Sequence, residues 1–189
     1  MTTVALVTGA NQGIGRAVVE GLVRALDSEA VVYLTGRSPE RVEQAATEVP
    51  GTVPAVLDVR DTAAVASFAE LVRQRHGGID IVVSNAAAWR TPERSDAAQV
   101  REFVDTNNLG ATRMIRAFGP LLRPAGRFLV VASAFGTLRN LAPELHKRFN
   151  TDTMTLDDVD AAGTGRAGPA PPRTTTSPGV TRGDDTGDR

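Results

Sequence analysis

Near its N-terminus the chain carries the glycine-rich segment Thr8-Gly9-Ala10-Asn11-Gln12-Gly13-Ile14-Gly15. It follows the apolar run Val4 to Val7 and opens an amphipathic segment from Ile14 to Leu26. A strand, a glycine turn and a helix in this order predict a dinucleotide phosphate site, because glycine permits sharp turns and the close approach of a ligand. The unpaired amides at the start of such a helix attract a pyrophosphate. The spacing T-G-x-x-x-G-x-G differs from the G-x-G-x-x-G of many dinucleotide folds.

Composition limits the class of protein. The 189 residues suffice for one domain, and 41% hydrophobic with 23% charged residues is typical of globular proteins. A net charge of −1 gives no electrostatic reason to bind nucleic acid or an anionic membrane. The absence of cysteine and the wide separation of His76 and His146 indicate no metal site. With no apolar run of ~20 residues and no basic leader, we expect a cytoplasmic protein.

Short apolar runs alternate with amphipathic segments along most of the chain. The segments between the runs carry apolar residues at helical spacing. This alternation predicts right-handed βαβ units and therefore an α/β fold with a doubly wound parallel sheet of the Rossmann type. The expected strands are 4–7, 30–35, 52–57, 79–83 and 127–132.

Individual residues sharpen this prediction. Ser38 and Pro39 are typical of a helix N-cap and first helical position, and Asp61 is a candidate cap for the next helix. Pro54 favours an edge position for the third strand, because proline lacks a backbone donor. Periodicity places Ile14 on the buried stripe of the first helix. It also places Val100 and Phe103 on the buried face of a long helix over 98–122.

The regular pattern weakens after Ser133. Residues 143–149 predict a short helix, and Thr155 with an acid three residues later predicts another helix start that ends within about one turn. Glycine, proline and threonine dominate from 161 to 189, and Val180 is the only sizeable apolar residue of that segment. We therefore expect a Rossmann-like domain over 1–160 and a disordered tail over 161–189.

Several motifs in a fixed order make the chain resemble the short-chain dehydrogenase/reductase family over about residues 2 to 160. Besides the glycine turn, these are Leu57-Asp58-Val59, Asn85-Ala86-Ala87, Thr106-Asn107 and Ser133. Within the family the chain looks most like the monomeric NADPH-dependent carbonyl reductases. The resemblance implies hydride transfer between a nicotinamide cofactor and a small ketone, aldehyde or quinone.

The resemblance also implies a role for each motif. Asp58 and Val59 would hold the adenine, and Asn85 to Ala87 would line the inner ribose. Ser133 would hydrogen-bond the substrate carbonyl, and Asn107 would organise a proton relay. The pyrophosphate would be held by residues of the glycine turn, namely Gly9, Asn11, Gln12, Gly13, Ile14 and Gly15.

Arg37 bears on the choice of cofactor. A fold that selects NAD places an acid at the end of the second strand, whereas Thr35-Gly36-Arg37 offers a guanidinium that suits the 2′-phosphate of NADP. Gln12 is neutral where related carbonyl reductases often carry a second basic residue, which weakens the preference without reversing it. The alternative is that Arg37 is only a solvated arginine before a helix.

The sequence departs from the family at the proton donor. The family uses a tyrosine with a lysine four residues later, because a phenol with a pKa of about 10 is a poor base without help. Here the single tyrosine is Tyr33, the single lysine is Lys147, and no Y-x-x-x-K occurs. We therefore expect an impaired oxidoreductase. A nucleotide-binding protein without catalysis and a truncated remnant are the alternatives, and His146 in place of the phenol is a weaker one.

The missing pattern also has structural implications. A family sheet continues beyond the fifth strand, so residues 127–132 are expected to form an unpaired apolar edge. The composition beyond about Asp160 indicates a truncated chain, one read out of frame, or a deliberate tail. The oligomeric state stays open at this stage.

Overall fold

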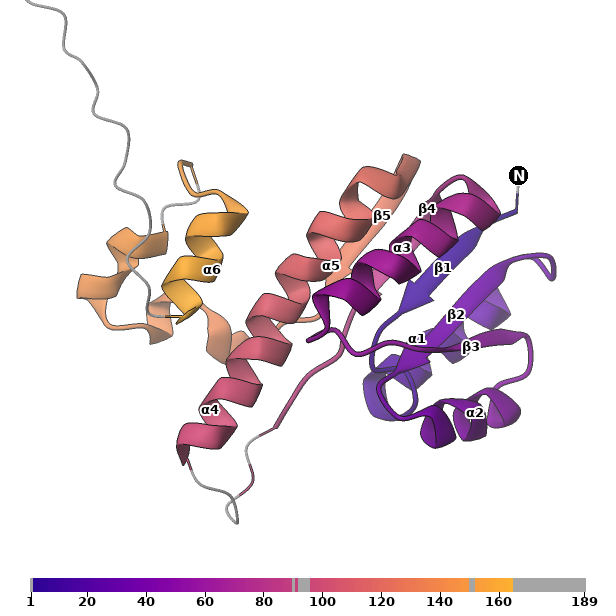
Figure 1. Ribbon diagram of the computed structural model, residues 1–189, viewed down its shortest axis with the longest axis horizontal. Coiled ribbons are helices and arrows are strands. Elements are labelled where there is room, and N and C mark those ends of the chain that lie inside the picture. The colour runs from indigo at the N-terminus through magenta and orange to yellow at the C-terminus, as the bar shows by residue number, and fades with distance from the viewer. Residues whose placement is uncertain (1, 90, 92–95, 150–151, 165–189) are drawn as a thin grey trace, which may run out of the picture.

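The computed structural model describes residues 2–89, 91, 96–149 and 152–164. Their centre is a parallel five-stranded sheet with the strand order β3-β2-β1-β4-β5 (Figure 1). The predicted α/β fold with a doubly wound parallel sheet is confirmed. The strands are β1 (Val4–Val7), β2 (Val31–Gly36), β3 (Thr52–Val56), β4 (Ile79–Ser84) and β5 (Leu122–Val130).

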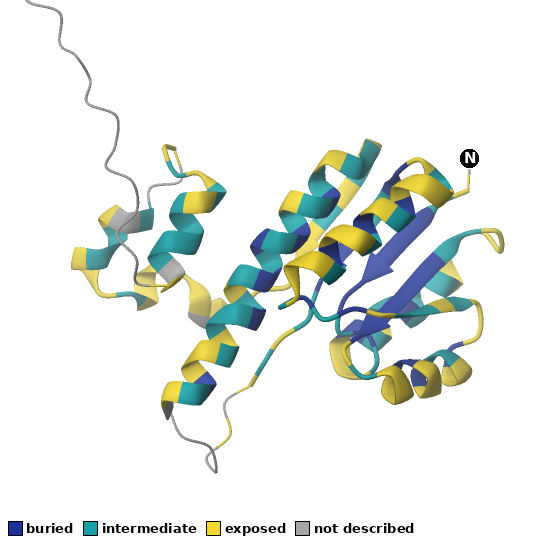
Figure 2. Cartoon of the chain, in the orientation of Figure 1, coloured by how far each residue is buried: buried dark blue, intermediate teal, exposed yellow. Residues whose placement is uncertain are grey.

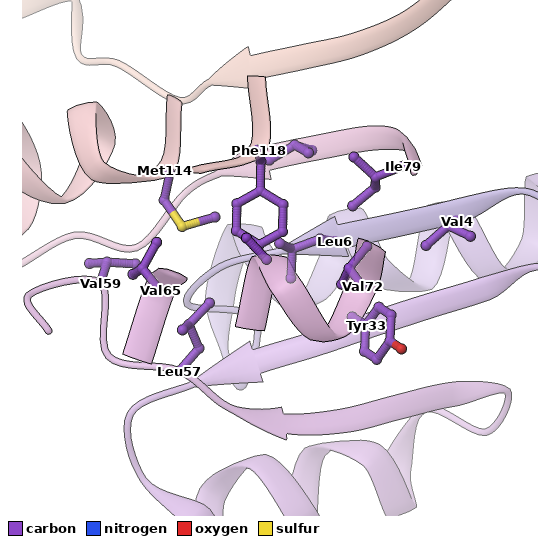
Figure 3. Packing of buried hydrophobic residues seen from close by; sticks show 12 residues of the cluster. Val4, Leu6, Tyr33, Leu57, Val59, Val65, Val72, Ile79, Met114 and Phe118 are labelled. Atoms are coloured by element: carbon purple, nitrogen blue, oxygen red, sulfur yellow. The ribbon is translucent and has the colours of Figure 1, made fainter. Parts of the chain in front are cut away.

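Helices cover both faces of this sheet. Alternate residues of β1 point into two separate cores. Leu6 packs in the cluster that contains Phe118 and Met114 (Figure 3). Val7 packs in the cluster on the opposite face, which contains Val19. Burying each such side chain stabilises the fold by about 1.5–3 kcal/mol. One face carries α1 (Gly13–Ala25) and α2 (Pro39–Glu48), and the other carries α3 (Thr62–His76) and α5 (Gly110–Phe118).

The predicted helix caps and the predicted edge position of the strand that contains Pro54 are confirmed. The Ser38 hydroxyl accepts a hydrogen bond from the Arg41 amide at 3.4 Å, with Pro39 as the first residue of α2. Asp61 accepts from the amides of the first turn of α3. β3, which contains Pro54, lies at the edge of the sheet. These caps fix where each helix starts and therefore how each loop leaves the sheet.

Three predictions of burial were wrong. Ile14 is 67% exposed, because α1 starts at Gly13 and its first turn extends past the end of β1. Val100 and Phe103 are 49% and 39% exposed. They belong to α4 (Asp96–Val104), which runs beyond the sheet (Figures 1 and 2). A π-helical segment, η1 (Asp105–Leu109), lies between α4 and α5, so one helical period does not continue through the whole segment.

β5 forms the other edge of the sheet. β5 begins at Leu122, which pairs with Ile79 of β4, earlier than predicted. After a register shift the pairing continues from Arg127 to Val130, the first four residues of the predicted strand. Leu129, Val130 and Val131 are about half exposed, so the expected apolar edge is confirmed. The short 3-10 helices η3 (Ala134–Gly136), η4 (Leu138–Asn140) and η5 (Pro143–Phe149) follow.

The last described element is α6 (Leu156–Thr164). The predicted capping box is present: the Thr155 amide donates to the Asp158 carboxylate at 2.9 Å, and the Asp158 amide donates back to the Thr155 hydroxyl at 3.3 Å. Helical structure continues to Thr164, so the expectation that it stops within about one turn was wrong. Residues 165–189, most of the expected disordered tail, lie outside the described residues.

Candidate functional site

The predicted site residues gather at one edge of the sheet. Because all five strands are parallel, their carboxyl ends meet at the same edge. The glycine turn follows β1, Arg37 follows β2, Asp58 follows β3, and the Asn85 segment follows β4. Ligands bind in open α/β sheets at this edge.

Thr8 joins the glycine turn to the loop after β4. Its buried hydroxyl accepts hydrogen bonds from the amides of Asn85 and Ala86 at 2.9 and 3.0 Å. In return the Asn85 side-chain amide donates to the carbonyls of Thr8 and Gly9 at 3.0 and 3.2 Å. Four hydrogen bonds therefore fix the two loops against each other. Asn85 is a structural brace here, and Ala87 lies on the exposed side of the same loop.

Two glycines of the turn are required by the packing. Gly9 has φ of +63°, and a Cβ there would lie 2.8 Å from the Ala86 Cα. A Cβ on Gly15 would lie 2.4 Å from the Asn85 side-chain nitrogen and 2.5 Å from the Gly9 carbonyl oxygen. Larger residues at either position would push the turn away from the loop after β4.

The start of α1 fits an anionic ligand. Gln12 precedes the helix in an extended conformation, makes no side-chain cap to the first turn, and no acidic residue lies in that turn. Gly13 has φ of +58°, and a Cβ there would meet no atom within 4 Å. The exposed side chains of Gln12 and Ile14 flank this open space, and Asn11 packs against Gly36. A pyrophosphate would take the place of the missing cap.

Arg37 lies in a group of alternating charges at the end of β2. Its guanidinium Nη1 is 3.1 Å from Glu102 Oε1 of α4, and Arg60 Nη1 is 3.7 Å from the same oxygen. Arg60 also binds Asp58, with Nη2 at 2.6 Å from Oδ2. The hydrogen bonds from Arg60 hold the pKa of the Asp58 carboxyl below its usual range, against the opposing effect of burial.

Val59 presents its backbone rather than its side chain to this edge. The side chain is 4% exposed and belongs to the core under α5, where a Cβ on Gly110 would lie 2.8 Å from Val59 Cγ2. The Val59 carbonyl accepts a hydrogen bond from Arg113 at 3.3 Å. Any contact of Val59 with an adenine would therefore use main-chain atoms.

Asn107 lies in the π-helical segment and contacts the loop after β4. Its Oδ1 accepts from the Ala88 amide at 2.7 Å, and its Nδ2 donates to the Ala88 carbonyl at 3.2 Å. The hydroxyl of the preceding Thr106 is buried without a hydrogen-bond partner among the described atoms. π-helical turns of this kind often occur at functional sites.

Ser133 follows the end of β5 on an exposed segment. The Val131 amide donates to the Ser84 carbonyl at 2.9 Å, so the chain still runs beside β4 just before Ser133. The Ser133 carbonyl accepts from the Gly136 amide at 2.9 Å, which closes the short turn η3. Ser133 therefore leaves the sheet at the same edge as the other predicted residues.

The single tyrosine is placed away from this edge. Tyr33 is 2% exposed, and its hydroxyl oxygen lies 2.9 Å from Nε2 of His76. His76 ends α3 and precedes the amino end of β4. His146 lies 2.9 Å through Nε2 from the Leu141 carbonyl, on η5 beside Lys147. Tyr33 lies within β2 and its partner His76 precedes the amino end of β4, so this pair is not at the carboxyl edge.

Sequence reasoning missed four residues of this region. Thr8 opened the motif but was not assigned a contact, although a threonine at a strand end can accept from a neighbouring loop. Arg60 lies two residues after Asp58, and this i, i+2 spacing of opposite charges was a local signal of an ion pair. Ala88 and Glu102 have no local signal, because their partners are distant in sequence.

Two further findings concern the described residues alone. No group of three or more histidine or acidic side chains among them is arranged to hold a metal ion. None of the helices they form has both the length and the apolar character needed to cross a bilayer.

The chain matches the family model of the short chain dehydrogenases over residues 3–142. It is 33% identical over 166 residues to carbonyl reductase [NADPH] 1 of Sus scrofa, a match that covers 84% of this chain. The human protein of the same name is 31% identical over 164 residues, or 82% of this chain. The chain spans 57% and 58% of the lengths of these two relatives.

Solved structures show the same similarity. The alcohol dehydrogenase of Thermococcus sibiricus, complexed with 5-hydroxy-NADP, is 32% identical with a TM-score of 0.58. That match covers 69% of this chain and 57% of the other. Menthone neomenthol reductase of Mentha piperita, at 21% identity and a TM-score of 0.71, shares the fold over 87% of this chain and 72% of its own.

Proposed function

Since the chain belongs to the short-chain dehydrogenase family, we propose that its carboxyl edge binds NADP(H) and serves hydride transfer with a small carbonyl compound. The observation that carries the proposal is the bracing of the glycine turn by Thr8, Asn85 and Ala86. This bracing fixes the turn that leads into α1, whose uncapped start is where a pyrophosphate would bind. The relatives named NADPH carbonyl reductases support the choice of cofactor and substrate class.

Each predicted residue has a place in this proposal. The amides of Gly13, Ile14 and Gly15 would bind the pyrophosphate, beside Gly9, Asn11 and Gln12. Arg37 would bind the 2′-phosphate of NADP, in preference to the bare ribose of NAD. Asp58 and the Val59 backbone would hold the adenine, and the Asn85-Ala86-Ala87 loop would line the inner ribose.

The chemistry at the carbonyl would rest on few side chains. When bound, NADPH supplies the hydride that reduces the carbonyl carbon. The Ser133 hydroxyl would donate a hydrogen bond to the carbonyl oxygen and stabilise the charge that develops there. Asn107 would keep the loop at Ala88 in place beside the cofactor.

Protonation of the product oxygen would be slow in this chain. Tyr33 is buried and paired with His76, so it is not available at the carboxyl edge. The proton would then come from water, without the gain of about 10²–10⁴ that a positioned acid provides. We therefore propose slow turnover or none. This favours the second candidate function, a protein that binds the dinucleotide without catalysis.

A reduction assay separates the two candidates. The purified chain is mixed with NADPH and a panel of quinones, ketones and aldehydes, and consumption of NADPH is followed. Turnover that Ser133→Ala abolishes supports the oxidoreductase, with Ser67→Ala as a control, because Ser67 is an exposed serine of α3 outside the site. NADPH binding without turnover supports the binding protein. Failure of the chain to bind any dinucleotide contradicts both.

A further inference from the structure

Two guanidinium groups converge on one carboxylate beside the end of β2. Glu102 Oε1 lies 3.1 Å from Arg37 Nη1 and 3.7 Å from Arg60 Nη1. The three residues come from α4, the end of β2 and the segment after β3, so the fold rather than local sequence brings them together. The Glu102 side chain is 19% exposed, whereas the Arg37 side chain is 63% exposed. The Glu102 carboxylate is therefore largely shielded from solvent, whereas the Arg37 guanidinium is accessible to it.

Arg60 is held from its other side by Asp58. Its Nε lies 3.0 Å from Asp58 Oδ1, and its Nη2 lies 2.6 Å from Oδ2. The order Arg37, Glu102, Arg60, Asp58 is an alternating row of charges with no formal net charge. A cation pair that shares one small anion has the arrangement that binds a phosphate group.

We propose that Glu102 is an internal counter-ion at a 2′-phosphate site, and that Arg60 is the second guanidinium of that site. This inference rests on the proposed binding of NADP. A phosphate monoester carries about −1.5 to −2 charge near neutrality, so it outcompetes the single charge of a carboxylate for the two guanidiniums. Arg60 supplies the positive charge that the neutral Gln12 lacks.

The counter-ion affects the two cofactors differently. NADP must displace Glu102 from Arg37 and Arg60 before its phosphate binds them. NAD carries a ribose hydroxyl at the same position, and this hydroxyl can donate a hydrogen bond to a carboxylate. Glu102 therefore lowers the affinity for NADP and leaves the affinity for NAD unchanged or higher. It sets how strongly the site prefers the phosphorylated cofactor.

The test compares NADPH and NADH binding by fluorescence titration in wild-type protein, Glu102→Gln and Glu43→Gln. Glu43 is an exposed acid of α2, so its variant makes the same change in net charge outside the group. Glu102→Gln is expected to tighten NADPH binding by about twofold to fivefold, the range for releasing a partly exposed ion pair. NADH binding should stay equal or weaken, and Glu43→Gln should change neither.

A second background tests whether Glu102 acts through the two arginines. The gain for NADPH is expected to disappear when Glu102→Gln is combined with Arg37→Ala, and Arg60→Ala alone should weaken NADPH more than NADH. Thermal melts of each variant establish that it is folded. An unchanged or weakened NADPH affinity in Glu102→Gln, or equal tightening of both cofactors, overturns the counter-ion role.

The outcomes also separate this inference from the proposed function. If wild-type protein binds NADPH and Glu102→Gln binds it equally well, the counter-ion role fails and the nucleotide site stands. If neither protein binds NADPH or NADH, the proposed function fails, and the role of Glu102 fails with it.

Discussion

Asn107 holds the main chain of Ala88 through both of its side-chain polar atoms. Oδ1 accepts from the Ala88 amide at 2.7 Å, and Nδ2 donates to the Ala88 carbonyl at 3.2 Å. A side chain of the π-helical segment thus fixes the loop after β4, next to the residues that Thr8 braces. The loop is held at two successive points, by Thr8 at Asn85 and Ala86 and by Asn107 at Ala88.

Replacing Asn107 with alanine removes both hydrogen bonds to Ala88. We expect NADPH affinity to fall by about fivefold to 150-fold, because the two lost bonds together contribute about 1–3 kcal/mol to the order of the loop. Asn108→Ala is the matched control, since Asn108 is the exposed neighbour on the same turn. Equal effects of the two variants in a fluorescence titration would contradict the role of Asn107.

Thr8→Val keeps the shape of the side chain and removes its hydroxyl. The amides of Asn85 and Ala86 then lose their acceptor, which costs about 1–3 kcal/mol of unfolding free energy. Urea denaturation measures the loss. Thr8→Ser retains the acceptor and should recover most of the stability. A valine variant as stable as wild type would show that the hydroxyl does not brace the loop.

The glycines of α1 separate a packing requirement from helix propensity. Gly15→Ala places a Cβ against Asn85 and Gly9, so we expect a loss of about 1–3 kcal/mol. Gly21→Ala is the control, because a Cβ there meets nothing within 4 Å. It should stabilise the helix by about 0.5–1 kcal/mol. Thermal melts with opposite shifts support this account; two shifts of the same sign argue against it.

His76 gives the folded state a pH dependence. Burial lowers the pKa of His76 below 6.5, and the charges of Arg123 and Arg75 lower it further. The folded chain therefore binds fewer protons than the unfolded chain below pH 6.5, so stability falls as the pH falls from that value through the lowered pKa. Above pH 6.5 the imidazole is mostly neutral in both states, so His76 no longer lowers the stability of the fold.

Urea denaturation across this pH range, in wild-type protein and His76→Gln, isolates the effect. The other titrating groups are common to both proteins, so the difference between their stability curves reports His76 alone. We expect the gap to change between pH 6.5 and the lowered pKa. A gap that is constant with pH would rule out this coupling.

Much of the sheet was predictable because its signals are local. Apolar runs bounded by glycine and proline gave the five strands, and Ser38, Asp61 and Thr155 marked helix starts. Parallel strands then fixed the common edge at which Arg37 and Asp58 lie. These predictions needed only the neighbours of each residue in the chain.

The remaining features depend on contacts between distant segments. The π-helical segment between α4 and α5 interrupts the helical period, so the exposure of Val100 and Phe103 could not be read from spacing. The positions of Glu102 beside Arg37 and of His76 beside Tyr33 follow from how helices pack on the sheet. Ile14 looked like a core residue because its period matched a stripe that begins one turn later.

Whether this edge binds NADP is tested by the affinity of the wild-type chain for NADPH and for NADH, with Arg37→Ala and Arg24→Ala measured beside it. Arg24 is an exposed arginine in the last turn of α1, at the end of the helix away from the glycine turn, and it serves as the charge control. We predict tighter binding of NADPH than of NADH. Arg37→Ala should weaken NADPH binding about tenfold or more, as expected for loss of a charge-assisted contact, and should leave NADH binding nearly unchanged. Arg24→Ala should change the affinity for neither cofactor. Equal affinity for the two cofactors, or an NADPH affinity that does not depend on Arg37, would contradict the assignment of this edge as an NADP site.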